Sequence, residues 1–280
     1  MDLIGIQTDI AWEERGTNFA RVREMLAAAH IAPGSLLVLP ELFAVGFSLD
    51  PGKVADRGRE TELFLLDLAQ QYQSHVVGGV ARHDESGAAN EALVADPEGR
   101  RVGSYRKLHP FSLAGEGESY AAGGEVKVFR CGEFAMAPTI CYDLRFPELY
   151  RRAVDLGAEL LVVIANWPSM RIDHWMTLLK ARAIENQAYV IGVNRVGQDP
   201  QHSYPGKSLI VDPRGQILAE GGSDPMLLRA SAHARVVADW RLAFPALADR
   251  RNDWRATTET GEMDDPAPKY PGEVPVWRRP

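Results

Sequence analysis

Residues 93–99, LVADPEG, have a close counterpart later in the chain, residues 209–215, LIVDPRG. Each copy contains an Asp-Pro-x-Gly turn, in which proline takes the second turn position and glycine lies near the exit. Apolar stretches on both sides of such a turn are typical of a β-hairpin. The sequence therefore predicts two hairpins of the same design. Because such turns are common, chance similarity is the alternative.

The similarity continues upstream of both hairpins. HVVG (75–78) precedes the first hairpin and YVIG (189–192) precedes the second at nearly the same distance, and LLVL (36–39) and LLVV (160–163) lie before those. Short apolar strands that alternate with stretches of helical period are typical of α/β proteins. If each half forms a sheet with helices on one face, the two bare faces must be buried against each other. We therefore predict a four-layer α-β-β-α sandwich.

Two helices are predicted around this framework. Residues 18–30 carry apolar side chains at intervals of three and four, with Thr17 as a candidate cap. Residues 173–186 form a second candidate helix, whose apolar stripe consists of Trp175, Leu179 and Ala183.

Composition narrows the class of protein. The 280 residues include 31 basic and 38 acidic side chains, a net charge of −7 that argues against a nucleic-acid binder. The longest apolar run, 160–165, is much shorter than the roughly 20 residues of a membrane-spanning helix. Asp2 and Asp9 do not fit a signal peptide. Cys131 and Cys141 are too few for a disulfide scaffold and lack metal-ligand spacing. We therefore expect a cytoplasmic protein that binds neither nucleic acid nor membrane.

The C-terminal part of the chain differs from the rest. We predict one domain over residues 1–255 and a proline-rich tail over 256–280 that has too few aliphatic residues for its own core. Such a tail is either a disordered end or an extended arm that lies on the body or on a neighbouring subunit.

Cys141 lies where an apolar strand, 137–140, meets a polar turn at Tyr142 and Asp143. A corner between a strand and a helix presents a nucleophile at the end of a sheet and directs backbone N–H groups towards an oxyanion. The alternative is that Cys141 is a small buried hydrophobic residue, the usual role of an isolated cysteine. Cys131 lies at no such corner, and we assign it the second role.

Two charged residues follow predicted strands in the same way. Glu41 comes after the apolar run 36–39, at the C-terminal end of a strand, where catalytic groups gather in α/β sheets. Lys107 ends the second strand of the first hairpin. The alternatives are a carboxylate that caps a loop and a solvated lysine at a strand end. Together with Cys141, these residues would supply a general base, a cation for an oxyanion and a nucleophile.

Histidine is the usual base for a cysteine nucleophile. His109 lies in a predicted loop after a strand, and His174 lies at the start of the second candidate helix. Spacing alone cannot place either ring beside Cys141, so a Cys-His dyad is a competing hypothesis.

Three segments resemble the signature regions of the nitrilase superfamily, the carbon–nitrogen hydrolases. They are LPELF (39–43), YRKLHPF (105–111) and TICYDLRFPELYR (139–151), in the right order and at fitting separations. The resemblance covers about residues 1–255, and further runs look most like the amidases of the omega-amidase type: AGEGESYAAG (114–123), ANWP (165–168), HW (174–175), ARAIENQAYV (181–190) and NRVG (194–197). It implies the four-layer fold, a homodimer, and no metal or organic cofactor.

The resemblance also implies a role for each residue of a Glu-Lys-Cys triad. Glu41 takes the thiol proton, Cys141 attacks an amide carbonyl, and the oxyanion is held by Lys107 and the backbone N–H of Tyr142. Glu41 then protonates the departing ammonia and activates water against the thioester.

Members of the family carry a second glutamate on the loop after the lysine. Glu116 and Glu118 are both candidates here, and the match of the surrounding residues favours Glu116 as the positioning residue. The sequence departs from the family pattern at Pro110, which replaces an aliphatic residue and removes a backbone donor, so it could shift this loop.

The substrate implied is a small monoamide with a free carboxylate, such as 2-oxoglutaramate. Arginine suits the carboxylate because its planar fork binds one bidentately. Arg171 is the first candidate and Arg145 the second, with a structural ion pair, for instance Arg145 with Glu148, as the alternative. Asn166 and Trp167 are expected to line the pocket. A nitrilase or an N-carbamoyl amidohydrolase with the same triad, and a non-catalytic family member, are the competing functions.

Overall fold

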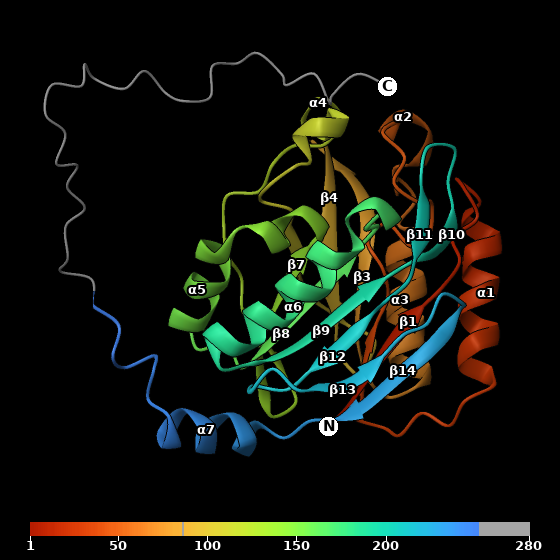
Figure 1. The fold of residues 1–280 in the computed structure, drawn as a ribbon. Coiled ribbons are helices and arrows are strands. Elements are labelled where there is room, and N and C mark those ends of the chain that lie inside the picture. Colours follow the sequence, from red (N-terminus) through yellow and green to blue (C-terminus); the bar gives the residue numbers. More distant parts are fainter. Residues whose placement is uncertain (86, 252–280) are drawn as a thin grey trace, which may run out of the picture.

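The computed structural model describes residues 1–85 and 87–251, so the tail predicted at 256–280 lies outside the described residues. Within the described part, the strands form two six-stranded sheets and one two-stranded ribbon (Figure 1). The first sheet has the order β14-β1-β2-β3-β4-β5 and the second the order β13-β12-β9-β8-β7-β6.

The strands of the first sheet are β1 (Asp2–Gln7), β2 (Leu36–Val38), β3 (His75–Asp84), β4 (Gly87–Ala95), β5 (Arg101–Arg106) and β14 (Met226–Ser231). Those of the second sheet are β6 (Phe129–Cys131), β7 (Phe134–Ile140), β8 (Leu160–Ala165), β9 (Tyr189–Asn194), β12 (Leu209–Val211) and β13 (Ile217–Glu220). The ribbon consists of β10 (Val196–Gln198) and β11 (Ser203–Pro205).

The helices are α1 (Arg15–Ala27), α2 (Pro51–Val54), α3 (Glu60–Gln71), α4 (Glu116–Ser119), α5 (Pro147–Asp155), α6 (Ile172–Asn186) and α7 (Ala234–Ala243). Short 3-10 helices cover Ser112–Ala114, Cys141–Arg145 and Ser169–Arg171. Among the described helices, none has both the length and the apolar character needed to cross a membrane.

The internal repeat is confirmed by the topology. In the first sheet, β1, β2 and β3 run parallel and are followed by the antiparallel β4 and β5. In the second, β7, β8 and β9 run parallel and are followed by the antiparallel β12 and β13. Both predicted turns form in the same way: the side chain of Asp96 accepts backbone hydrogen bonds from Glu98 and Arg100, and that of Asp212 accepts them from Arg214 and Gln216.

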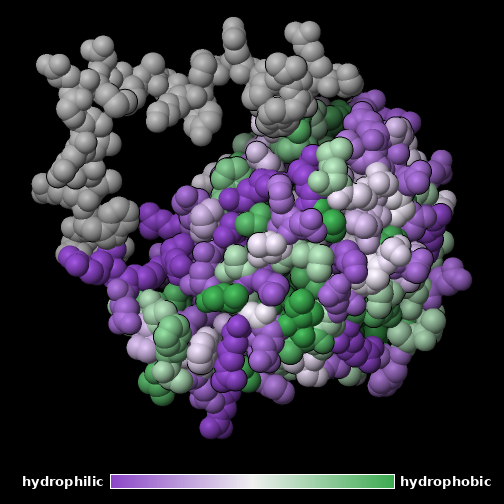
Figure 2. Space-filling model, in the orientation of Figure 1, coloured by the Kyte–Doolittle hydropathy of each residue, from purple (hydrophilic) through white to green (hydrophobic). Residues whose placement is uncertain are grey.

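The predicted four-layer sandwich is also observed. Alternate strand residues point into two different cores, because successive side chains of a strand face opposite sides. Leu3 and Leu36 pack between the two sheets, whereas their neighbours Ile4 and Leu37 pack with α1 and α3. Figure 1 shows α5 and α6 on one side of the stacked sheets and α1 and α3 on the other. On the face drawn in Figure 2, hydrophobic residues lie in small separate groups among hydrophilic ones.

One helix boundary differs from the prediction. The helix predicted over residues 18–30 begins at Arg15 and ends at Ala27, and Thr17 lies inside it rather than at its cap. The reason is Asn18, whose buried side chain bonds to the backbone of Ala11 and to the carbonyl oxygen of Ala44. The second candidate helix is observed as α6, with its stripe of Trp175, Leu179 and Ala183 fully buried.

Candidate active site

The structure brings four of the predicted residues to one place. Glu41 follows β2, Lys107 follows β5, Cys141 follows β7, and Glu116 is the first residue of α4. The parallel strands β2 and β7 belong to different sheets, and their carboxyl ends meet at the same edge of the sandwich. Glu41, Lys107 and Glu116 are almost completely buried beneath this edge.

Glu41 is held from both sheets. In the second sheet, the backbone N–H of Asn166 donates to Glu41 Oε2 at 2.8 Å, and Asn166 Nδ2 donates to the carbonyl oxygen of Glu41 at 2.8 Å. In the first sheet, the loop after β2 lies directly against Gly79 of β3, where a Cβ atom would come within 2.1 Å of the Leu42 backbone nitrogen. Any larger residue at this position would displace the loop that carries Glu41.

Lys107 connects the two carboxylates. Its Nζ lies 2.9 Å from Glu41 Oε1, 2.7 Å from Glu116 Oε2 and 3.1 Å from Glu116 Oε1. Burial by itself lowers the pKa of Lys107, but the negative charges of Glu41 and Glu116 outweigh this effect and raise it well above its ordinary value. Lys107 is therefore an ammonium ion over the whole working pH range of an enzyme.

Of the two candidate glutamates on the next loop, Glu116 reaches the site and Glu118 is exposed. Glu116 Oε2 also accepts a hydrogen bond of 2.6 Å from the backbone N–H of Phe111. This contact turns the loop back towards Lys107 directly after Pro110. Proline at that position has therefore not moved Glu116 away from the lysine.

Cys141 begins the 3-10 helix with a positive φ of 48°, a conformation that a residue with a Cβ atom rarely adopts. Its Sγ lies 3.8 Å from the carbonyl oxygen of Asn166. Burial, the negative charge of Glu41 and a hydrogen bond with Glu41 raise the pKa of the thiol well above its ordinary value. The thiol of the resting protein is therefore protonated at neutral pH and needs a base beside it to become a nucleophile.

Sequence reasoning missed the central role of Asp143 in this corner. The fully buried carboxylate accepts hydrogen bonds from Tyr105 Oη at 2.8 Å and from the backbone N–H of Ile140 at 3.1 Å. It also accepts one of 3.0 Å from the backbone N–H of His109, whose Nδ1 lies 2.8 Å from the same oxygen. Asp143 thus joins the segment before Cys141 to the segment after Lys107.

The two histidines of the competing dyad have other partners. His109 pairs with Asp143 and stacks on Phe146, with 3.7 Å between the ring centroids. His174 is exposed, and its Nδ1 lies 3.2 Å from Arg145 Nη2. In the described part of the chain, neither ring is bonded to Cys141 or lines the cavity that contains it.

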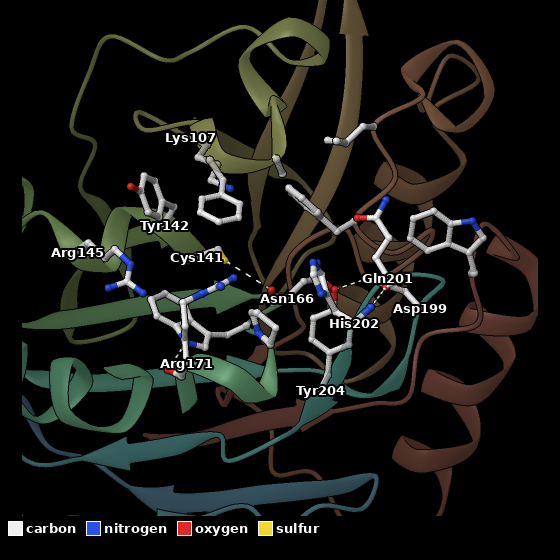
Figure 3. A pocket seen from close by; sticks show the side chains of 17 residues that line it. Lys107, Cys141, Tyr142, Arg145, Asn166, Arg171, Asp199, Gln201, His202 and Tyr204 are labelled. Atoms are coloured by element: carbon white, nitrogen blue, oxygen red, sulfur yellow. Dashed lines mark hydrogen bonds between the residues drawn. The ribbon is translucent and has the colours of Figure 1, made fainter. Parts of the chain in front are cut away.

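A cavity of about 130 Å³ opens above Cys141 (Figure 3). Lys107, Cys141, Asn166 and Trp167 line it together with aromatic side chains from several loops. In Figure 3, Arg145 and Arg171 lie to one side of Cys141, and Gln201 and His202 lie to the other. We call these last four residues, which line the mouth of the cavity, the rim.

Both arginines of the rim face aromatic rings rather than acids. The guanidinium of Arg145 lies 4.9 Å from the ring centroid of Trp167, and that of Arg171 lies 5.4 Å from the centroid of Phe111. Burial and the positive charge of Arg145 lower the pKa of Arg171. Among the described residues, no carboxylate forms an ion pair with either arginine, so the suggested pair of Arg145 with Glu148 does not form.

Asn166 and Trp167 both line the cavity, as expected. Trp167 Nε1 donates to the carbonyl oxygen of Arg171 at 2.7 Å, which fixes the loop that carries this arginine. Sequence reasoning missed the wall formed by the loop between β10 and β11, which contributes Gln201 and His202. No residue pattern marked this loop, because its side chains reach the cavity only through the pairing of the ribbon.

The comparisons with known proteins agree with this geometry. The family model of the carbon–nitrogen hydrolases matches residues 5–241. The 2-oxoglutaramate amidase of Bacillus subtilis (strain 168) is 37% identical over 251 residues, a match that covers 89% of this chain and 96% of that protein. The omega-amidase YafV of Escherichia coli (strain K12) is 34% identical over 259 residues, covering 92% of this chain and 96% of that protein.

A solved structure extends the similarity to the whole fold. A CN-hydrolase superfamily protein from Xanthomonas campestris, with an arsenic adduct in its active site, has a TM-score of 0.85 to this chain at 32% sequence identity. The match covers 91% of this chain and 99% of that one. The fold, the family model and the full-length relatives lead to one conclusion: the chain belongs to the carbon–nitrogen hydrolase family.

Proposed function

We propose that this protein is an omega-amidase-like enzyme, which hydrolyses the terminal amide of a small carboxylate-bearing substrate such as 2-oxoglutaramate to the acid and ammonia. The observation that carries the proposal is the contrast across one cavity. Cys141 lies beside the buried carboxylate of Glu41 and the buried ammonium of Lys107. Arg145 and Arg171, which have no acidic partner among the described residues, line the same cavity. The names of the relatives from Bacillus subtilis and Escherichia coli support the same activity.

The first half of the reaction is acylation of the cysteine. Because the pKa of the Cys141 thiol is raised, Glu41 must take its proton as the sulfur attacks the amide carbon. The negative charge that develops on the carbonyl oxygen is stabilised by the Lys107 ammonium and the backbone N–H of Tyr142. The amide group of Tyr142 lies in the first turn of a 3-10 helix, where N–H groups have no partner within the helix.

The second half releases ammonia and the acid. Glu41 gives its proton to the departing nitrogen, which leaves as ammonia, and the acyl group stays on Cys141 as a thioester. Glu41 then takes a proton from water as the water attacks the thioester, and the thiol is restored when the carboxylic acid leaves. Glu116 holds Lys107 in place through both steps.

Substrate selection is assigned to the rim. The carboxylate of the substrate would bind Arg171 first and Arg145 second, since a guanidinium that meets no acid in the folded protein is free to bind one from solution. Asn166 and the ring of Trp167 would lie along the substrate between the reacting amide and this carboxylate.

The remaining features of the proposal rest on the family resemblance. We propose a homodimer with a single domain over residues 1–255; the proline-rich tail predicted over 256–280 lies outside the described residues. The free cysteines Cys131 and Cys141 support function in the reducing cytoplasm. The chemistry described needs no metal or organic cofactor.

Ammonia release from a panel of compounds tests the function, with Cys141→Ala as the control. The panel contains 2-oxoglutaramate, succinamate, glutamine, a simple aliphatic amide, an N-carbamoyl amino acid and a nitrile. Release from the carboxylate-bearing monoamides that is lost in the control supports the proposal. Preferred release from the nitrile would indicate a nitrilase, and preferred release from the N-carbamoyl compound would indicate an N-carbamoyl amidohydrolase. No ammonia release from any compound would favour a non-catalytic role.

A further inference from the structure

Asn90 is a residue of β4 that the reaction described above does not use. It is 1% exposed, and the described residues that line the cavity do not include it. Its Nδ2 donates a hydrogen bond of 2.7 Å to Glu41 Oε1 and one of 3.0 Å to Glu116 Oε1. One neutral amide group therefore bridges the two carboxylates that share Lys107.

We propose that Asn90 is a positioning residue of the active site, which keeps the Glu41 carboxylate ionised and oriented as the base for Cys141. The inference rests on the proposed role of Glu41. The single positive charge of Lys107 does not balance the two carboxylates, and the neutral amide of Asn90 supplies the further hydrogen bonds that they need.

The charges of the cluster explain why a neutral donor is needed. Glu41 and Glu116 together carry two negative charges when ionised, and Lys107 supplies one positive charge, shared between them. Burying such an excess of negative charge is costly unless further donors bond to the carboxylates. Hydrogen bonds from Asn90 stabilise the ionised form without adding a group that exchanges protons with the reaction.

The hydrogen bonds also define the orientation of Glu41. Its Oε1 accepts from Asn90 and Lys107, and its Oε2 accepts from the backbone and the side chain of Asn166. Both oxygens are therefore held before a substrate arrives. The carbonyl oxygen of Asn90 also accepts a hydrogen bond of 3.0 Å from the backbone N–H of Lys107, so the same residue aligns the lysine.

The orientation of the Asn90 amide follows from its neighbours. Its Oδ1 is buried and has no hydrogen-bond partner among the described residues. A reversed amide would place this oxygen against two carboxylates, which can only accept. The NH₂ group must face Glu41 and Glu116, and the unpaired Oδ1 is the cost of that arrangement.

The charged and titratable residues near Glu41 are all retained when Asn90 is changed, although Glu116 also loses its hydrogen bond from Asn90. The titratable and charged groups that face it are Lys107, Glu116, the Cys141 thiol and the Tyr120 hydroxyl. Burial and nearby carboxylates raise the pKa of Tyr120 far above neutrality, so it remains uncharged. A change in the pH profile of an Asn90 variant can therefore be assigned to the lost hydrogen bonds.

The test is Asn90→Leu, which keeps the approximate shape of the side chain and removes the donor. Two rates are followed against pH: kcat/KM for 2-oxoglutaramate, and alkylation of Cys141 by iodoacetamide, located by peptide mass. Both rates need an ionised base, and a carboxylate that has lost a charge-assisted hydrogen bond binds its proton at higher pH. In both pH profiles the rate falls on the acid side, and we expect the midpoint of this acid limb to lie about one pH unit higher than in the wild-type protein. At higher pH the rate should recover towards the wild-type value.

The matched control is Asn186→Leu. Asn186 is also fully buried, has an unpaired Oδ1 and donates through Nδ2, to the carbonyl oxygen of Arg182 at 3.0 Å and to Glu185 Oε1 at 3.4 Å. Both partners belong to α6, and neither is part of the cluster around Lys107. This variant should lose stability without shifting the acid limb of the kcat/KM profile or of the alkylation profile. Alkylation of Cys131 does not interfere, since burial raises the pKa of its thiol to about 12.

Two results would overturn the inference. One is an Asn90→Leu protein that is slower at every pH with its acid limb unmoved, as a purely structural role requires. The other result applies if Asn90→Leu does not fold. Asn90→Ser, which keeps a shorter donor, should then show a smaller upward shift of the acid limb. A folded serine variant whose acid limb matches that of the wild-type protein would refute the role. Alkylation breaks the carbon–iodine bond of iodoacetamide and leaves its amide intact. A shifted alkylation profile together with no ammonia release from the substrate panel would therefore support the role of Asn90 while refuting the proposed substrate.

Discussion

At the base of the cavity, Glu41, Lys107 and Glu116 are buried, and each of their charged groups is bonded to at least two partners from the protein. At the rim, Arg145 and Arg171 are only half-buried, and they lie against the rings of aromatic residues rather than against acids. Both regions carry positive charge beside Cys141, but among the described residues Lys107 pairs with carboxylates of the protein and the two arginines do not.

Under the proposed function, this difference corresponds to two tasks. Groups that stabilise a transition state work best when they are oriented before the substrate binds, because no reorganisation is then needed during the reaction. Groups that select a substrate must keep hydrogen-bonding capacity for it. Changes in the buried cluster should therefore reduce kcat and stability, whereas changes in the rim should raise KM with little effect on either.

The largest expected effect belongs to Lys107→Ala. Removal of one oxyanion donor typically reduces the rate by about 10²–10³, and the change also leaves Glu41 and Glu116 without the ammonium between them. Breaking a buried ion pair from one side costs about 3–5 kcal/mol of stability. Turnover and urea denaturation measure the two effects, and a folded Lys107→Ala protein with near-normal kcat would remove the lysine from the mechanism.

A smaller and different effect is expected from Arg171→Met. Loss of one charge-assisted hydrogen bond to the substrate carboxylate should raise KM for 2-oxoglutaramate roughly 10- to 100-fold. The kcat value and the KM for a neutral aliphatic amide should change little, and Arg145→Met serves as the comparison within the rim. An equal loss for neutral and anionic amides would show that Arg171 shapes the loop rather than binds the carboxylate.

The smallest effect is expected from His174→Ala. The exposed ring lies 3.2 Å from Arg145 Nη2 of the rim, so KM should rise by about twofold, as for the loss of one weak hydrogen bond. Alkylation of Cys141 by iodoacetamide should be unaffected. If either His174→Ala or His109→Ala abolished alkylation, the Cys-His dyad would replace the Glu-Lys-Cys mechanism.

The fold could be predicted from the sequence because its signals are local. The Asp-Pro-x-Gly turns and the short apolar runs each determine a hairpin or a strand within about ten residues, and their repetition along the chain indicated the two stacked sheets. The start of α1 was predicted wrongly because the contact that shifts it, between Asn18 and Ala44, is not local. Local pattern alone favoured a helix that begins three residues later.

For the candidate site, Glu41, Lys107 and Cys141 stand out in the sequence because each follows a predicted strand within a recognisable motif. The choice of Glu116 over Glu118 also came from the motif, and the structure brings the same residue to Lys107. The sequence did not single out Asn90, nor assign a role to Asp143. Buried asparagine and aspartate residues have many structural roles. Without their position in the fold, the residue type therefore does not indicate which of them belong to the active site.

The sequence by itself determined which residues can supply a nucleophile, a base and an oxyanion cation, since these depend on residue type and on the ends of strands. Only the tertiary structure decided which neighbours tune them. Asn166 is 125 positions from Glu41, and Asn90 is 49 positions from it. His202, which lines the same cavity, lies in the loop of the ribbon between β9 and β12. Hydrogen bonds act over about 3 Å in space regardless of separation along the chain, so these partners become known only when the two sheets are stacked.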